Sequence, residues 1–189
     1  MLEVEMKFPV GELPRLQERL QSVGAHLHAT RTEADQYFNA PDRDFAQTDE
    51  ALRIRSIGEH NVLTYKGPKR DRETKTRTEL EVAFATGSET AAQLATLLQH
   101  LGYRPVAVVR KERALYHLHQ AGFAVEVCLD HVDAVGMFAE IEIVAPESQE
   151  QAAKQAVREL AQQLGFSGSE RRSYLELWLE KQKIDANQR

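Results

Sequence analysis

Charged and apolar residues alternate in the first segment of the chain, and the charged ones have the types needed for metal and phosphate chemistry. In EVEMK, Glu3, Glu5 and Lys7 alternate with Val4 and Met6. Side chains along a β-strand point alternately to its two faces, so we expect the three charges on one face. Carboxylate oxygens are ligands for hard divalent cations, and a lysine ammonium is a compact partner for phosphate. Such chemistry requires that this face be enclosed rather than solvated.

The same alternation recurs in segments farther along the chain. Its charged positions are Arg53, Arg55, Lys66, Arg77, Glu79, Glu81, Lys111, Arg113, Glu126, Asp130, Glu140 and Glu142. For any one strand, the simplest interpretation is a solvated face with weak surface ion pairs. Two features of the whole set favour enclosure. The charged faces are rich in Arg and in Glu-x-Glu repeats, and the helices carry Leu-rich stripes that need apolar sheet surface to cover.

A sheet that curls until its charged face points inward would satisfy both features. A barrel of about eight strands has room for one small ligand. Buried ions are costly unless they are paired, so acids and bases must pair across the interior or be completed by a charged ligand. A lining of both signs suits a polyanion carried with a divalent metal ion.

Hydrophobic periodicity and turn residues predict the elements that would hold these side chains. We expect strands at residues 2–8, 25–39, 51–58, 61–67, 77–84, 104–119, 122–132 and 136–145. We expect helices at residues 12–24, 88–102, 148–165 and 173–181, the second of them with Ser88 as its N-cap. Together they predict one α+β domain over residues 1–189, built as a closed eight-stranded antiparallel β-barrel with a charged interior and helices packed outside.

Composition limits the partners of the protein. The net charge of the 189 residues is -5, which argues against a nucleic-acid partner held by bulk electrostatics. Cys128 is the single cysteine, so the sequence excludes an internal disulfide and a multi-cysteine zinc site. Because the sequence has neither a signal segment nor an apolar run of membrane-spanning length, we expect a cytoplasmic protein with no membrane partner.

An ordered series of motifs resembles a known family. The series EVEMK, ALRIR, TYKGP, TELEV, RKER, LDHV and EIEI is similar to that of the CYTH superfamily, the triphosphate tunnel metalloenzymes. It covers about residues 1–145, and SYLEL near residue 174 resembles the C-terminal segment of the family. The stretches DQYFNAP, QTDEALRIR and LTYKGPK most resemble the class IV adenylyl cyclase group.

The resemblance implies a tunnel that binds a triphosphate with Mg²⁺ or Mn²⁺, and it implies roles for particular residues. The implied metal ligands are Glu3, Glu5 and Glu140, assisted by Asp130 and Glu142. The implied phosphate-binding residues are Lys7, Arg53, Lys66, Lys111 and Arg113, with Arg55 and Arg77 beside them. The implied catalytic set is Glu3, Glu5, Lys7, Arg53, Lys111, Arg113 and Glu140, while Glu79 and Glu81 would orient the bases. Homodimers are common among relatives.

Three functions are compatible with these motifs. An adenylyl cyclase would convert ATP to cAMP and pyrophosphate, and a triphosphatase would hydrolyse inorganic, thiamine or nucleoside triphosphate. Both reactions would use the same cradle, and the sequence contains no adenine pocket that can be recognised. A non-catalytic binder of polyphosphate or nucleotide is the third possibility, although a simple anion binder would not need the carboxylates.

Other reactive residues are interpreted as structural. His26 and His28 share one strand face, as do His117 and His119, and we interpret these histidines as surface or rim residues rather than metal ligands. Cys128 has the inward parity of its charged neighbours, but no adjacent base would make it a nucleophile. The segment GPKRDRETKTR is interpreted as a solvated loop or, alternatively, as a cationic mouth that attracts a polyanion.

Overall fold

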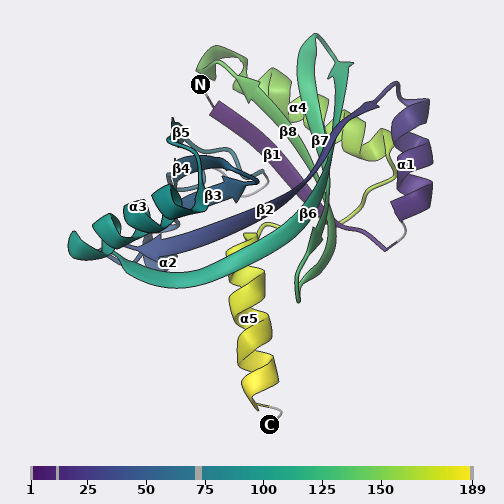
Figure 1. Cartoon of the computed structure of the whole chain (residues 1–189). Helices are drawn as coiled ribbons and strands as arrows, with labels where there is room; N and C mark the ends of the chain where they lie inside the picture. The colour runs from purple at the N-terminus through teal and green to yellow at the C-terminus, as the bar shows by residue number, and fades with distance from the viewer. Residues whose placement is uncertain (1, 12, 71–73, 188–189) are drawn as a thin grey trace.

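The computed structural model describes residues 2–11, 13–70 and 74–187, which form an α+β fold around one curled sheet (Figure 1). The strands are β1 (Leu2–Pro9), β2 (His26–Asn39), β3 (Ala51–Ile57), β4 (His60–Lys66), β5 (Glu79–Phe84), β6 (Arg104–Gln120), β7 (Phe123–Val132) and β8 (Gly136–Ala145). The helices are α1 (Leu13–Ser22), α2 (Phe45–Thr48), α3 (Ser88–His100), η1 (Glu147–Gln149), α4 (Glu150–Gln163) and α5 (Tyr174–Asn187).

All neighbouring strands of the sheet are antiparallel, in the order β1-β8-β7-β6-β2-β3-β4-β5. The long strands β2 and β6 pair with each other and join its two halves, with β1, β7 and β8 in one half and β3, β4 and β5 in the other (Figure 1). Strand register is interrupted between Leu27 and Ala29 and again between Tyr37 and Phe38. Such irregularities bend a strand and increase its twist, which helps these two strands to curl the sheet.

The closed barrel expected from the sequence is not formed as a continuous ladder in the described residues. Strands β1 and β5 are the two ends of the sheet order. An isolated bridge between Glu3 and Arg77 links these ends, and the Lys75 N–H donates to the Glu5 carbonyl at 3.0 Å. Arg77 was expected to lie in a regular strand, but β5 begins only at Glu79, and Arg77 forms the isolated bridge to Glu3 instead. Part of the expected loop, residues 71–73, lies outside the described residues.

Helices α1 and α4 cover the convex face of the half that contains β1 and β8. Their apolar side chains pack with those of the strands in one core, to which Leu20, Leu160, Val4, Val127 and Ile141 each contribute a side chain with no exposed area. Apolar residues of β1 therefore point to the helices, as alternation predicted, and its charged residues point to the concave face.

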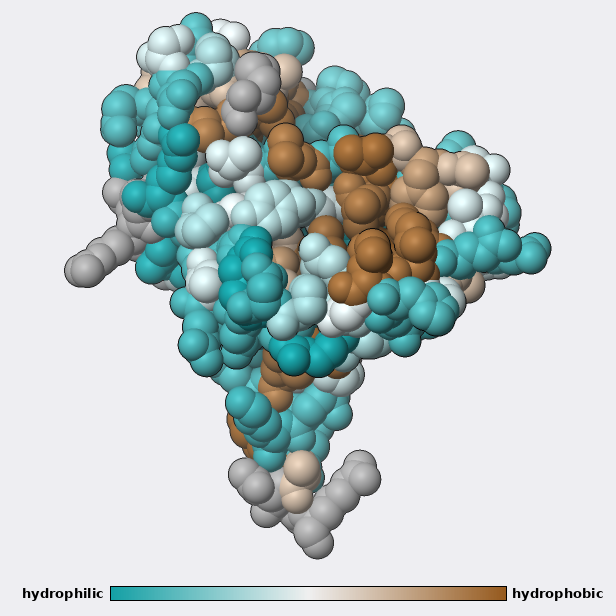
Figure 2. Space-filling model, turned by 90° about the vertical axis from the view of Figure 1, so that its left-hand side faces the viewer, coloured by the Kyte–Doolittle hydropathy of each residue, from teal (hydrophilic) through white to brown (hydrophobic). Residues whose placement is uncertain are grey.

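Helix α3 covers the other half, and α5 projects from the molecule (Figure 1). Leu98 of α3 packs with Ile54 of β3 in a second core. Tyr174 at the start of α5 packs in a third core with Phe138 and Val109. The face seen in Figure 2 carries exposed apolar side chains, and those on β5 and at the end of α3 are Leu80, Val82, Leu97 and Leu101. Within the described residues, no helix combines the length and apolarity that crossing a membrane would need.

The prediction that Ser88 is the N-cap of α3 is wrong. Gly87 occupies that position with a φ of 98°, a conformation that favours glycine, and Ser88 is the first helical residue. The side chain of Asn61 stabilises this junction, because its Nδ2 donates to the carbonyls of Ala85 and Gly87 at 3.0 and 2.8 Å. The last helix also runs beyond residue 181, to Asn187, and the short helix α2 was not expected.

We expect Asn61→Ala to lower the free energy of unfolding by about 1–3 kcal/mol, because it removes the side-chain hydrogen bonds to the Ala85 and Gly87 carbonyls. Thr96→Ala on α3 is the matched control, since this exposed residue donates its hydroxyl to the Ala92 carbonyl within the helix, away from the junction. Urea unfolding of both variants measures the difference, and equal stabilities would contradict a role for Asn61 at this junction.

Candidate functional site

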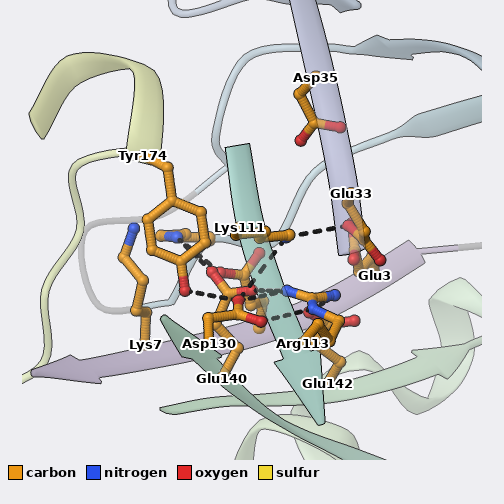
Figure 3. A network of polar contacts seen from close by, with 12 residues as sticks. Glu3, Lys7, Glu33, Asp35, Lys111, Arg113, Asp130, Glu140, Glu142 and Tyr174 are labelled. Atoms are coloured by element: carbon orange, nitrogen blue, oxygen red, sulfur yellow. Dashed lines mark hydrogen bonds and ion pairs between the residues drawn. The ribbon is translucent and has the colours of Figure 1, made fainter. Parts of the chain in front are cut away.

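The concave face of the curled sheet surrounds a cavity of about 850 Å³. The charged residues predicted from strand alternation line it, with the exception of Lys7 and Asp130. Asp130 contacts the lining residues Arg113 and Tyr174, and the ammonium group of Lys7 lies over the ring of Tyr174 (Figure 3). The structure therefore brings the predicted site residues together around one space.

Strand register explains which charges meet. In the paired strands β6 and β7, Arg113 is opposite Asp130. In β2, Glu33 is opposite Lys111 of β6, and Asp35 is opposite Arg55 of β3. Basic strand positions thus face acidic ones across most of the sheet, which is the arrangement that cross-strand pairing stabilises.

Strands β1 and β8 follow this rule where Lys7 is opposite Glu140, but two residues along they place a carboxylate beside a carboxylate. Glu5 is opposite Glu142, and ligand oxygens of Glu3, Glu5 and Glu142 lie within 4.8 Å of one another. Burial, together with Glu3 and Glu140, raises the pKa of Glu142 well above its usual value. Burial and Glu79 likewise raise the pKa of Glu3. A divalent cation would relieve this repulsion, and a set of carboxylate oxygens suits Mg²⁺ or Mn²⁺.

Glu140 has a different environment from Glu142, although the two residues share a strand face. Its carboxylate accepts from Arg113 Nη2 at 2.6 Å and lies 3.7 Å from Lys75 Nζ. Burial alone would raise the pKa of Glu140, but Lys75 and Arg113 hold it well below the usual value. Glu140 therefore remains ionised and paired with bases. The group of three neighbouring carboxylates consists of Glu3, Glu5 and Glu142 and does not include Glu140. The implied role of Glu140 as a metal ligand remains a prediction.

Arg113 is the centre of a buried network (Figure 3). Its guanidinium donates to both carboxylate oxygens of Asp130, at 2.7 and 2.6 Å. Asp130 also accepts from the Tyr174 hydroxyl at 2.8 Å and lies 3.6 Å from Lys111 Nζ. Bidentate pairing fixes the plane of the guanidinium, so the edge of Arg113 that faces the cavity is held in a defined orientation.

A second network holds the bases of β3. Arg55 donates to both oxygens of Asp35 at 2.7 Å, and Arg53 donates to one of them at 3.2 Å. Glu33 lies 3.2 Å from Lys111 and 3.1 Å from Arg55. Burial alone would raise the pKa of Glu33, but Lys111 and Arg55 lower it to about 2. Both acids are therefore counter-ions that keep the cationic side of the cavity charged.

Lys66 and Lys75 connect the basic side of the cavity to the three-carboxylate group. Lys66 Nζ lies 2.5 Å from Glu79 and 3.4 Å from Glu3. Lys75 Nζ donates to Glu5 at 2.5 Å. Each lysine therefore neutralises a carboxylate that a bound metal ion would otherwise neutralise.

Lys7 lies under the start of α5. Its ammonium group is 4.0 Å from the centre of the Tyr174 ring and donates to the Arg172 carbonyl at 2.5 Å. Burial and the neighbouring Lys75 lower the pKa of Lys7 to about 7. The C-terminal segment thus holds Lys7 at the edge of the site rather than in its lining.

Sequence reasoning missed four residues of these networks. Glu33 and Asp35 were available from alternation in TRTEADQY, but the residues that alternate with them, Thr32, Ala34 and Gln36, gave no apolar face to recognise. Lys75 lies outside a regular strand, and Tyr174 reaches the site from the C-terminal helix, so neither had a periodic signal.

Comparison with known proteins identifies a family and several relatives. The model of the CYTH domain matches residues 1–174. A protein of Methanocaldococcus jannaschii, "Putative adenylate cyclase MJ0240", is 34% identical over 180 residues, covering 94% of this chain and 98% of that protein. The Aeromonas hydrophila protein "Adenylate cyclase CyaB" is 29% identical over 178 residues, covering 91% of this chain and 86% of that protein.

Solved structures share the fold. The PH1819 protein of Pyrococcus horikoshii superimposes with a TM-score of 0.83 at 36% identity, covering 95% of this chain and 99% of that one. The Hippeastrum protein HpAC1, described as having a dominant triphosphatase activity, superimposes with a TM-score of 0.60 at 17% identity, covering 90% of this chain and 92% of that one. The second likeness concerns the fold alone.

We expect Tyr174→Phe to lower the free energy of unfolding by about 1.5–3 kcal/mol, because it removes a hydrogen bond to a charged carboxylate but keeps the ring over Lys7. Tyr103→Phe is the control, since Tyr103 packs beside the α3 core, away from this network. Chemical unfolding at neutral pH measures both. An effect no larger than that of the control would show that the Asp130 contact contributes little.

The pKa of Glu33 predicts a loss of stability in acid. Because its value falls from 4.5 to about 2 on folding, its contribution is fully present above pH 4.5 and is lost as the pH falls through about 2. This contribution is of order 3 kcal/mol. We expect Glu33→Gln to be less stable at pH 7 and to have a shallower decline of unfolding free energy between these pH values. Glu18→Gln, an exposed change on α1, is the control and should keep the decline of the parent protein.

Proposed function

This chain belongs to the CYTH family, and from that premise we propose that it is a divalent-metal-dependent adenylyl cyclase that converts ATP to cAMP and pyrophosphate. One observation carries the proposal: a group of three carboxylates and a set of counter-ion-held bases line the same cavity. A triphosphate needs both, because bases bind its oxygens and a metal ion neutralises its remaining charge.

The three carboxylates fit a metal ion by donor type and spacing. Glu3, Glu5 and Glu142 would hold it, with Glu140 beside them. Bound there, the ion would supply Lewis-acid stabilisation of phosphate oxygens and a lower pKa for an attacking hydroxyl. The protonation that burial and mutual repulsion favour at Glu142 would be released on binding, so affinity should increase with pH.

Arg53, Lys111 and Arg113 would bind and orient the triphosphate. Asp35, Glu33 and Asp130 already fix the directions of these bases, so little reorganisation would be needed when phosphate oxygens approach. In cyclisation, a bond forms between the ribose 3′ oxygen and the α-phosphorus while the bond to the β-phosphate oxygen breaks. The bases would stabilise the negative charge that develops on the departing pyrophosphate.

Apolar side chains around the cavity support a nucleotide rather than inorganic triphosphate as the ligand. Phe38, Phe45, Val106, Leu175 and Leu179 contribute apolar surface to its lining. Such surface suits a nucleobase, whereas inorganic triphosphate has no apolar part to bury. The names of the two relatives at 34% and 29% identity agree with this choice.

We also propose that the cavity works as a tunnel and that residues 1–189 act as one domain. The bridge between Glu3 and Arg77 would complete the wall between the sheet edges. Tyr174 supports the inclusion of α5, because its hydroxyl bonds to Asp130 within the site.

Triphosphatase activity is the second candidate. The same metal and phosphate residues would serve it, and the fold neighbour from Hippeastrum is described as having that activity. In this reaction, water would attack the terminal phosphorus and orthophosphate would leave with no cyclic product.

Incubation of the full chain with ATP and Mn²⁺ or Mg²⁺ tests the proposal. We expect cAMP and pyrophosphate in equal amounts, with no turnover in excess EDTA. If orthophosphate forms without cAMP, the protein is a triphosphatase and not a cyclase. If ATP and inorganic triphosphate both bind but neither is converted, the protein is a non-catalytic binder.

Glu5→Gln tests the metal group within the same assay. It removes a charge without changing volume, so we expect a loss of turnover of at least about 100-fold with an unchanged circular dichroism spectrum. Glu18→Gln on the outer face is the matched control for a generic loss of carboxylate charge. Full activity in Glu5→Gln would remove this carboxylate from the site.

A further inference from the structure

Four histidines gather at one end of the cavity, on two paired strands. They form two His-x-His motifs, His26-Leu27-His28 on β2 and His117-Leu118-His119 on β6. The register places His26 directly opposite His117. His26, His117 and His119 all line the cavity.

The rings of three of these histidines are neighbours. The centroids of His28 and His117 are 4.3 Å apart with the rings nearly parallel, and those of His26 and His117 are 6.1 Å apart with the rings perpendicular. The register shift between Leu27 and Ala29 falls at His28, which explains how two residues of one strand both reach His117.

A carboxylate completes the group. Glu126 of β7 is opposite His117 in register, and its Oε1 lies 3.6 Å from His117 Nε2. That nitrogen is shielded from solvent and has no hydrogen-bond partner. A shielded ring nitrogen without a partner is uncommon, and it points to a ligand that would complete it.

We propose that His26, His28, His117 and His119, together with Glu126, form a binding site for a borderline divalent transition metal ion such as Zn²⁺. We call these five residues the histidine cluster. Imidazole nitrogens with one carboxylate oxygen are a donor set that Zn²⁺ takes, whereas Mg²⁺ prefers oxygen ligands. The site is thus chemically distinct from the group of Glu3, Glu5 and Glu142.

Binding requires rotation of exposed side chains, since the histidine nitrogens are not gathered in the way that the ligand oxygens of the three-carboxylate group are. His26, His28 and His119 are exposed and free to change rotamer, while half-buried His117 provides a fixed point. Strand pairing already holds the backbones of β2 and β6 at the separation that a shared ion needs. Only side-chain torsions must change, and their cost is small beside the energy of metal coordination.

Titration of the full chain with Co²⁺ in the presence of excess Mg²⁺ tests the proposal directly. Magnesium fills the oxygen site but competes poorly for imidazole. We expect one Co²⁺ to bind and to produce visible absorption bands of low coordination number, displaced by Zn²⁺. Histidine ring resonances in NMR spectra should shift for cluster residues and not for His60 or His131.

Variants decide where the ion binds. We expect His26→Ala/His28→Ala and, separately, His117→Ala to weaken Co²⁺ binding by at least about tenfold. His131→Ala, an exposed change on the opposite face of β7, is the matched control and should bind as the parent does. The double variant changes only exposed residues, so it remains informative if His117→Ala fails to fold.

A competing location is the group of Glu126, Cys128 and Glu142, whose ligand atoms also lie within 4.8 Å of one another. Loss of binding in Cys128→Ser with retention in His26→Ala/His28→Ala would overturn the histidine cluster, as would unaltered binding in both histidine variants. Because no triphosphate is present in these measurements, their outcome is independent of whether ATP is converted.

Discussion

The pairing of opposite charges between neighbouring strands is the interaction on which the rest of this structure depends. A concave face lined by ions is stable only if each ion finds a partner, because desolvation costs more than isolated attraction returns. The strand order supplies those partners: β6, which carries Lys111 and Arg113, lies between acidic positions of β2 and β7. The fold can therefore bury many charged side chains on its concave face, where a folded protein would otherwise need apolar ones.

The exception between β1 and β8, where Glu5 is opposite Glu142, makes one side of the cavity acidic. Carboxylates adjoin carboxylates there, and the pKa of Glu142 rises while that of Glu140 falls. The pKa values of two acids on one strand face thus shift in opposite directions, because one contacts Arg113 closely and the other lies among acids. A carboxylate-rich region and a base-rich region of the cavity result from one pattern of strand register.

Alternation in the sequence was sufficient to predict which side chains share a face, and the periodicity of the helices predicted the layers that cover the outside. It could not predict partners, because pairing depends on register between strands distant in sequence. Glu33 and Asp35 are examples: each is recognisable as a strand residue, but its importance comes only from Lys111 and Arg55 opposite. The position of Tyr174 depends on where α5 docks. Ser88 is not the N-cap that the sequence predicted, because Asn61, far away in sequence, stabilises Gly87 in that position. The sequence pattern also could not predict whether the barrel closes, because closure depends on how the segment before β5 meets β1.

The junction between the two sheet edges has a consequence for how a ligand arrives. In the part of the chain that the structure describes, a short, irregular stretch around Lys75 and Arg77 joins β1 to the other edge, with backbone bonds of 3.0 and 3.4 Å. Releasing the two backbone bonds alone costs about 1–3 kcal/mol, and breaking the ion pairs of Lys75 with Glu5 and of Lys66 with Glu3 adds to that cost. Entry of any ligand along this side would therefore require breaking ion pairs as well as the two backbone bonds.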